Sequence, residues 1–170
     1  MRKQHSYLIW IMPEGEVKRK LSRIINKLSQ NYNSPKFEPH VTLVGSFEGT
    51  ESELIITAEK YSKLINPFEI ELTKAAYLNE FFRSLFILAK KTKSLLKNHE
   101  TGKKLFAVPN KRYLPHLSLI YGDFDAKTKK RIIKAIGENV NLKFKVKSIY
   151  LVHKNEVNLK WTVINKFDLN

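Results

Sequence analysis

A short motif, proline-histidine-apolar-hydroxyl-apolar, occurs twice in this chain and constrains its fold more than any other feature. Residues 39–43 read Pro-His-Val-Thr-Leu, and residues 115–119 read Pro-His-Leu-Ser-Leu. Both copies lie in short apolar segments that predict β-strands. Side chains two residues apart on a strand share a face, so each copy presents a histidine and a hydroxyl together and can bury its apolar residues behind them.

The two motifs supply the groups that phosphodiester cleavage needs. His40 and His116 can serve as acid and base, because the ordinary histidine pKa, about 6.5, lies near neutrality. Thr42 and Ser118 can donate hydrogen bonds to the phosphate oxygens, where negative charge builds in the transition state. The motifs are nearly symmetric, so the residues alone do not decide which histidine is the base. There is no His-x-His pair and no carboxylate cluster beside either motif, so we expect no metal and no cofactor.

The hydrophobic pattern predicts one α+β domain over residues 1–170, with mainly antiparallel strands and a rough internal repeat that indicates two lobes. The other histidines, His5, His99 and His153, lack the motif, and we expect them at the surface or at helix caps. The pattern predicts strands over 6–12, 37–47, 67–78, 84–89, 113–124, 142–146 and 157–163, and helices over 17–28, 50–65, 92–105 and 125–136.

The charge balance favours a polyanionic partner. Lys and Arg number 31 against 16 Asp and Glu, which gives a formal net charge of +15 at pH 7. RNA and nucleotides are the first candidates for such a surplus, although basic runs are also common on solvated helix faces. Lys111 and Arg112 closely precede the second motif and could border a binding cleft. Basic runs of this kind could also form a positively charged funnel that attracts RNA termini.

The sequence also limits the cellular compartment and the kinds of site that we expect for the chain. It has no cysteine, which excludes disulfides, thiolate metal sites and a cysteine nucleophile. Its apolar runs are too short to span a bilayer, and residues 7–12 are too short for a secretory signal. We therefore expect a cytoplasmic protein with no membrane partner, acting as a monomer.

The motifs and their surroundings resemble the two-histidine (2H) phosphoesterase superfamily, and within it the cyclic phosphodiesterases of plants and yeast. Segments 7–13, 35–42, 81–86 and 113–121 look like segments of that family in the same order. The similarity covers most of the chain and is weakest over 47–67 and near the carboxyl end. The resemblance implies a bilobal α+β fold, in which two antiparallel sheets related by a pseudo-twofold axis, with outer helices, surround a central cleft.

The resemblance also implies a reaction: metal-independent opening of nucleoside 2′,3′-cyclic phosphates to 2′-phosphates, and of ADP-ribose 1″,2″-cyclic phosphate to the 1″-phosphate. By position, His116 would activate water and His40 would protonate the leaving oxygen. The residues that would hold the substrate are Thr42, Ser118, Tyr121 and Trp10.

Two of these residues have a competing structural interpretation. Tyr121 lies five residues after His116, so strict alternation places it on the opposite face unless the strand ends or bulges near Gly122. Trp10 lies on a short apolar strand, where a tryptophan is more often a core residue than part of a ligand site.

Two other functions stay open at this point. One is an RNA-end processing enzyme of the same superfamily, either 2′-5′ RNA ligase-like or an oligonucleotide phosphodiesterase. The other is a non-catalytic RNA-binding module. The expected ligand is a small cyclic phosphate nucleotide, with RNA termini as the second candidate.

Overall fold

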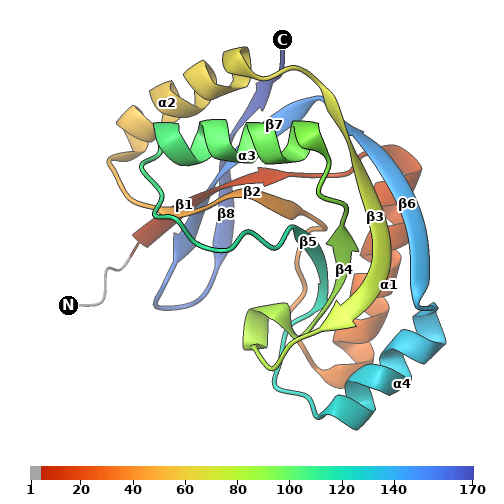
Figure 1. The fold of residues 1–170 in the computed structure, drawn as a ribbon. Coiled ribbons are helices and arrows are strands. Elements are labelled where there is room, and N and C mark those ends of the chain that lie inside the picture. The colour runs from red at the N-terminus through yellow and green to blue at the C-terminus, as the bar shows by residue number, and fades with distance from the viewer. Residues whose placement is uncertain (1–4) are drawn as a thin grey trace.

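A computed structural model of the chain describes residues 5–170. Their strands form one curved sheet, and the helices pack around it (Figure 1). Along the chain, the sequence β1-α1-β2-α2 is repeated as β4-α3-β5-α4, which matches the predicted internal repeat. The elements are β1 (His5–Ile11), α1 (Gly15–Tyr32), β2 (Val41–Phe47), α2 (Glu51–Leu64), β3 (Phe68–Tyr77), a 3₁₀ turn (Phe81–Arg83), β4 (Leu85–Ala89), α3 (Lys93–Leu105), β5 (His116–Ile120), α4 (Ala126–Ile136), β6 (Asn139–Val146), β7 (Ser148–Asn155) and β8 (Trp161–Asp168).

The sheet consists of two four-stranded halves that meet at the motif-bearing strands. Its order is β6-β3-β4-β5-β2-β1-β7-β8, and every described pair is antiparallel. The junction is narrow, because β2 and β5 pair at one position, Val41 with Leu117, whereas β1–β2 and β4–β5 each pair at four. The two sheets expected from the resemblance are therefore the halves of one eight-stranded sheet.

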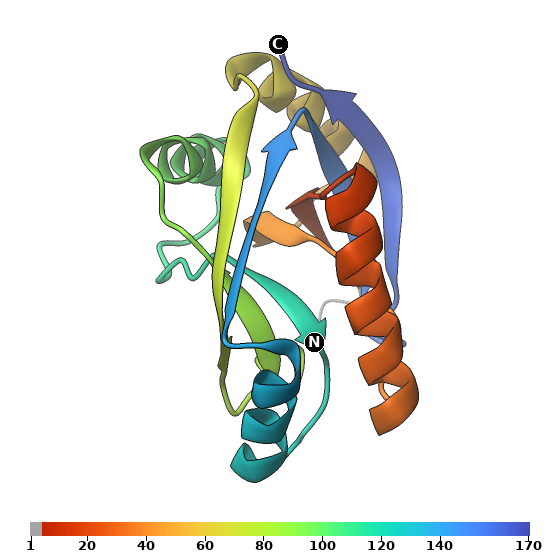
Figure 2. The same cartoon turned by 90° about the vertical axis from the view of Figure 1, so that its right-hand side faces the viewer.

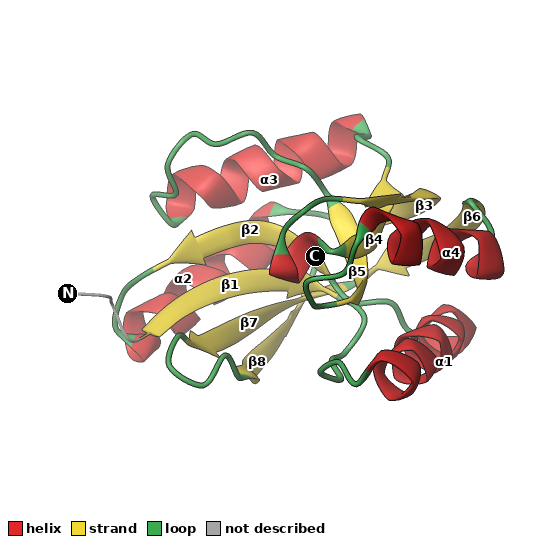
Figure 3. Cartoon of the chain, turned by 90° about the horizontal axis from the view of Figure 1, so that it is seen from below, coloured by secondary structure: helices red, strands yellow, loops and turns green. Residues whose placement is uncertain are grey.

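The helices tie the two halves together. The helix that follows β1, α1, packs on β5 and β6 of the other half, and the helix that follows β4, α3, packs on β2 and β3. Figures 2 and 3 show α1 and α3 on opposite sides of the sheet. Each motif strand is thus supported by a helix that comes from the other half, which fixes the two motifs relative to each other.

The helix starts follow the capping signals in the sequence. Thr92 and Asp125 each accept a hydrogen bond from the backbone N–H three residues further on, as N-cap residues do. Thr50 precedes α2 as predicted, but its hydroxyl donates to the Glu53 carboxylate at 2.6 Å instead of capping the backbone. Within residues 5–170, no helix has the length and hydropathy needed to cross a membrane.

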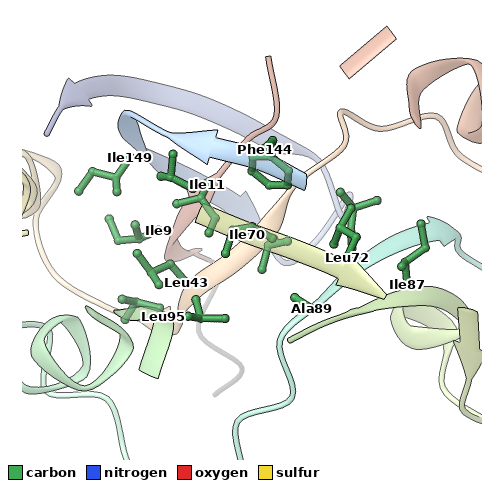
Figure 4. Packing of buried hydrophobic residues seen from close by; sticks show 14 of the residues in the cluster. Ile9, Ile11, Leu43, Ile70, Leu72, Ile87, Ala89, Leu95, Phe144 and Ile149 are labelled. Carbon is green, nitrogen blue, oxygen red and sulfur yellow. The ribbon is translucent and has the colours of Figure 1, made fainter. Parts of the chain in front are cut away.

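The apolar motif residues lie in the core. Val41, Leu43, Leu117 and Leu119 are all 0% exposed, which confirms that each motif strand buries this face. Figure 4 shows Leu43 beside other buried aliphatic side chains of the sheet. Burying a side chain of this size stabilises the fold by about 1.5–3 kcal/mol. The backbone that carries the two histidines is therefore anchored from behind.

Two strand predictions were wrong near the carboxyl end. The pattern missed β7 because its apolar run, 149–152, contains three fully buried residues and does not alternate with exposed ones. A strand covered on both faces does not alternate clearly. The strand predicted from 157 begins at Trp161, since residues 156–160 form the turn between β7 and β8. The strands predicted over 37–47 and 113–124 are also shorter than expected.

Candidate active site

The two motifs meet where the halves of the sheet join. His40 directly precedes β2, and His116 is the first residue of β5. Val41 lies opposite Leu117 in an antiparallel register. Continuing that register by one residue in each direction places His40 opposite Ser118 and Thr42 opposite His116, on the face away from the core. Diagonal neighbours such as His40 and His116 typically lie roughly 7–8 Å apart, which leaves room for a phosphate.

A cleft of about 550 Å³ opens over this junction. Its walls include every residue that the sequence pattern and the resemblance assigned to the site: Trp10, His40, Thr42, His116, Ser118 and Tyr121. The cleft thus combines residues from both halves of the sheet.

The two imidazoles are held in the same way. The Nδ1 atom of His40 lies 2.7 Å from the carbonyl oxygen of Glu38, and that of His116 lies 2.7 Å from the carbonyl oxygen of Leu114. A carbonyl oxygen only accepts, so Nδ1 must carry the proton in both rings. In the neutral imidazole this leaves the Nε2 lone pair free. Each ring can therefore accept a proton at Nε2, and donate one from Nε2 once it is protonated.

Burial favours the neutral form of both histidines. Burial, together with a smaller effect of positive charge on His116, lowers the pKa of His40 to about 4, against the effect of the hydrogen bond to Glu38. Burial also lowers the pKa of His116, and Arg83 acts in the same direction. Because two imidazolium ions this close repel each other, the pair resists taking up a second proton.

Trp10 contacts a catalytic candidate directly. Its ring stacks on the imidazole of His40 with centroids 3.5 Å apart and planes 9° from parallel. The Trp10 side chain is 4% exposed, and its indole N–H has no hydrogen-bond partner within residues 5–170. Trp10 is thus both a core residue and part of the cleft wall, so the two interpretations of its pattern are compatible.

The hydroxyl groups differ in their bonding. Thr42 is half-buried, and its hydroxyl has no partner in the described part of the chain. Ser118 is buried, and its hydroxyl donates to the carbonyl oxygen of Phe82 at 3.1 Å. A hydroxyl hydrogen rotates freely about its C–O bond, so Ser118 can redirect this donor toward a phosphate.

Tyr121 lies in the cleft because regular strand geometry ends before it. Strand β5 stops at Ile120, and its pairing with β4 is shifted by a bulge just before that point. The Tyr121 ring stacks on Phe37 at 4.0 Å, its hydroxyl makes a side-chain hydrogen bond with Ser118, and burial raises its pKa. The condition that the sequence set for Tyr121 to reach the cleft is therefore met.

The cleft wall also contains a second aromatic pair, His99 and Tyr113, which was not predicted from the sequence. His99 is buried, in contrast to its expected surface or cap position: its Nδ1 lies 2.7 Å from the carbonyl oxygen of Leu43 and its ring stacks on Tyr113 at 3.6 Å. The Tyr113 hydroxyl donates to the carbonyl oxygen of Thr42. Both residues thus support the backbone of the first motif. His99 lies four residues after the buried Leu95 of α3, and this helical spacing was the available signal.

Other wall residues gather by chemical type. Phe82 and Trp161 meet edge to face at 5.2 Å, and Tyr121 packs beside them. The cationic wall residues are Arg83, Lys103, Lys111, Arg112 and Lys154. Within residues 5–170, no three histidine, aspartate or glutamate side chains gather in a way that could hold a metal ion.

Comparison with protein families and curated proteins gives a consistent result. A model of the family described as cyclic phosphodiesterase-like protein matches residues 6–169. A curated cyclic phosphodiesterase from Arabidopsis thaliana is 26% identical over 129 residues, which cover 75% of this chain and 71% of the relative.

Solved structures share the fold at low sequence identity. E. coli LigT, solved in complex with 3′-AMP, superposes with a TM-score of 0.70 and 13% identity, over 99% of each chain. The protein TT0787 of Thermus thermophilus gives a TM-score of 0.67 and 20% identity, over 96% of this chain and 97% of that one. The expected α+β fold is therefore confirmed, and it is the fold of LigT.

Proposed function

We propose a specific reaction for this chain, which belongs to the cyclic phosphodiesterase-like protein family and is an enzyme of the 2H phosphoesterase superfamily. In this reaction, water opens a nucleoside 2′,3′-cyclic phosphate to the 2′-phosphate, or ADP-ribose 1″,2″-cyclic phosphate to the 1″-phosphate. No metal takes part. The proposal rests on two histidines that face one cleft, each with Nδ1 bound to a backbone carbonyl and Nε2 free.

The reaction needs one proton acceptor and one proton donor. For a 2′,3′-cyclic phosphate, the water oxygen bonds to phosphorus while the bond from phosphorus to the 3′ oxygen breaks. The neutral Nε2 of one histidine takes the proton from water, and the protonated Nε2 of the other gives its proton to the 3′ oxygen. The resemblance assigns the first role to His116 and the second to His40.

Substrate binding changes the protonation that burial favours in the free protein. Burial lowers the pKa of both histidines, and a positive charge on His116 also lowers that of His40, so the free pair favours two neutral rings and resists a second proton. The cyclic phosphate brings one negative charge between the rings. An opposite charge at this distance stabilises the imidazolium and raises its pKa. Substrate binding thereby supplies the condition for the acid to be charged.

The remaining wall residues suit a nucleotide phosphate. Thr42 and Ser118 lie opposite the histidines in the register, where their hydroxyls can donate to the non-bridging oxygens. Tyr121 is joined to Ser118 and can hold the same phosphate. Trp10 stacks on His40 and so fixes the orientation of its ring beside the phosphate. Phe82 and Trp161 offer aromatic surface of the kind on which nucleobases stack.

The test is hydrolysis of adenosine 2′,3′-cyclic phosphate in excess EDTA, with the product isomer identified by chromatography. We expect the 2′-phosphate. His40→Ala and His116→Ala should each lower kcat by on the order of 10² or more. The matched control is His153→Ala, because His153 is hydrogen-bonded to His5 and does not line the cleft. Loss of activity in EDTA, or near wild-type turnover by either cleft variant, would contradict the proposal.

An RNA-end processing enzyme is the second candidate, and the five cationic wall residues favour it. It would use the same two histidines on the terminal phosphate of an oligonucleotide. Turnover of oligonucleotides without turnover of mononucleotides would indicate this function, and tight RNA binding without turnover of either would indicate a binding module. The cytoplasmic location and the monomeric state stay predictions from the sequence.

A further inference from the structure

The cleft carries more positive charge than is needed to bind the single negative charge of a cyclic phosphate. Five Lys and Arg side chains line the cleft, and no aspartate or glutamate of residues 5–170 is among its wall residues. A cyclic phosphodiester carries a single negative charge. The two histidines and the hydroxyl groups already provide the contacts for that charge. The additional cations therefore indicate a ligand with further negative charge.

Three of the five cations are already held by protein groups. Arg83 forms an ion pair with Glu80 at 2.6 Å, and Lys154 forms one with Glu156 at 2.7 Å. The Lys103 amino group bonds to Glu100 and to the side-chain oxygen of Asn110, both at 2.7 Å. These charges are partly neutralised in the free protein, and so they are less available for a ligand.

Lys111 and Arg112 are different. Both are exposed, both line the cleft, and neither has a hydrogen-bond or ion-pair partner within the described residues. Their segment is nevertheless held at both ends: Lys103 bonds to Asn110 on one side, and Tyr113 stacks on His99 and donates to Thr42 on the other. Lys111 and Arg112 are thus cations without a partner among the described residues, on a segment that is fixed at both ends and lies beside the first motif.

The two types of wall residue lie next to different motifs. The aromatic residues Phe82 and Tyr121 contact Ser118 of the second motif, whereas the basic segment contacts Thr42 of the first through the neighbouring Tyr113. A nucleotide has a matching arrangement, because its base and its 5′ oxygen project from the ribose in different directions away from the 2′ and 3′ oxygens.

We infer that Lys111 and Arg112 form a second phosphate subsite, and that the enzyme acts on cyclic phosphates that carry another phosphate on the far side of the ribose. The inference rests on the proposed function and narrows its substrate class. Arginine binds phosphate through two parallel N–H bonds and lysine as a point charge, so the pair suits a phosphate dianion or a diphosphate. A 5′-phosphate, the next nucleotide of an RNA end, and the diphosphate of ADP-ribose all present this chemistry.

The test compares adenosine 2′,3′-cyclic phosphate with its 5′-phosphorylated form. Charge-assisted hydrogen bonds to one extra phosphate should raise kcat/KM by at least about tenfold in the wild-type protein. In Lys111→Gln/Arg112→Gln this preference ratio should fall toward one. The matched control is Lys145→Gln/Lys147→Gln, which removes the same charge from exposed lysines outside the cleft and should keep the ratio. A ratio is insensitive to partial unfolding, because both substrates report on the same active molecules.

Two further measurements distinguish the possible outcomes. For the phosphorylated substrate, kcat/KM should fall more steeply as the salt concentration rises, because salt screens the attraction between the added phosphate and the two exposed cations. Comparing ADP-ribose 1″,2″-cyclic phosphate with a dinucleotide cyclic phosphate then identifies which source of the second phosphate is preferred. Equal kcat/KM for the two adenosine compounds, or an unchanged ratio in the Lys111/Arg112 variant, would overturn the subsite alone. Hydrolysis of neither compound would overturn the proposed function and the subsite together.

Discussion

Val41 of β2 lies directly opposite Leu117 of β5, and this pair joins the two halves of the sheet. Both side chains are fully buried, so the contact is fixed from the core side. Because the strands are antiparallel, the same register sets the histidine of each motif across from the hydroxyl of the other. The site therefore consists of two pairs, His40 with Ser118 and Thr42 with His116, and each pair combines one residue from each motif.

The first prediction concerns which histidine is the acid. The resemblance assigns this role to His40, which must take up its proton when the phosphate binds, because burial lowers its pKa in the free protein. Replacing the leaving 3′ oxygen of the cyclic phosphate with sulfur removes the need for a proton, because a thiolate leaves unaided. The kinetic deficit of His40→Ala should therefore shrink by about tenfold or more on the sulfur substrate, within the usual range for acid catalysis.

The control for this assignment is His116→Ala, which should show the same deficit on both substrates because it removes the base. A deficit that shrinks for His116→Ala and not for His40→Ala would reverse the roles. The comparison needs only steady-state kcat values for wild type and two variants on two substrates.

Much of this site could be predicted from the residues, because its central features have a local cause. The period of two along a strand places His40 with Thr42 and His116 with Ser118, whatever the rest of the fold does. The carbonyl oxygens that fix the two tautomers lie only two residues before each histidine, but their direction depends on backbone angles that a pattern does not reveal.

Features with a non-local cause could not be predicted in this way. His99 is buried because α3 packs against the strand that carries Leu43, a contact between distant segments. Tyr121 enters the cleft through a bulge in β5 that exists only in its pairing with β4. The strand over 148–155 was missed because both of its faces are buried near 149–152, where α2 packs on it, and such a strand does not alternate. The single-position junction of the sheet has no sequence signature of its own.

The second prediction is an acid-shifted pH dependence. Activity requires one protonated and one neutral imidazole, and burial lowers the pKa of both below about 6.5 in the free protein. As pH rises through the higher of the two pKa values, the singly protonated pair disappears and kcat/KM falls. As pH drops through about 4, the second imidazole is protonated and kcat/KM falls again. The kcat/KM profile of the free enzyme should therefore be bell-shaped, with its maximum on the acid side of neutrality.

The measurement is kcat/KM against pH at constant ionic strength. The profile for kcat should lie at higher pH than that for kcat/KM, since the bound phosphate raises the imidazole pKa. A kcat/KM plateau that extends well into the alkaline range would contradict a mechanism that depends on a protonated histidine.

The third prediction concerns the stacked pair of Trp10 and His40. Replacing Trp10 with leucine opens the face of the imidazole to water, and desolvation is the main cause of the low pKa of His40. The pKa of His40 in Trp10→Leu should therefore rise from about 4 toward about 6.5, as measured by NMR titration of its ring protons. Trp161→Leu is the control, because Trp161 lines the same cleft but contacts Phe82 and Tyr121 instead. Equal titration of His40 in both variants would show that the stack does not set its pKa.

The fourth prediction concerns Lys129, a lysine on α4 that is 2% exposed and has no carboxylate partner within the described residues. Its amino group donates to the carbonyl oxygen of Leu78 at 2.8 Å and to the side-chain oxygen of Asn79 at 3.2 Å. These bonds hold the start of the loop that carries Phe82 into the cleft, where its carbonyl accepts from Ser118. Lys129 is thus a positioning residue for one wall of the site.

Lys129→Met keeps the length of the side chain and leaves two buried acceptors without a donor, which should lower the free energy of unfolding by about 1–3 kcal/mol. The exposed neighbour Lys130 provides the control: Lys130→Met should change the urea midpoint far less. Because the loop also positions the partner of Ser118, folded Lys129→Met should lose kcat/KM under conditions where its circular dichroism is native. Full activity together with the expected loss of stability would show that Lys129 supports the fold and not the site.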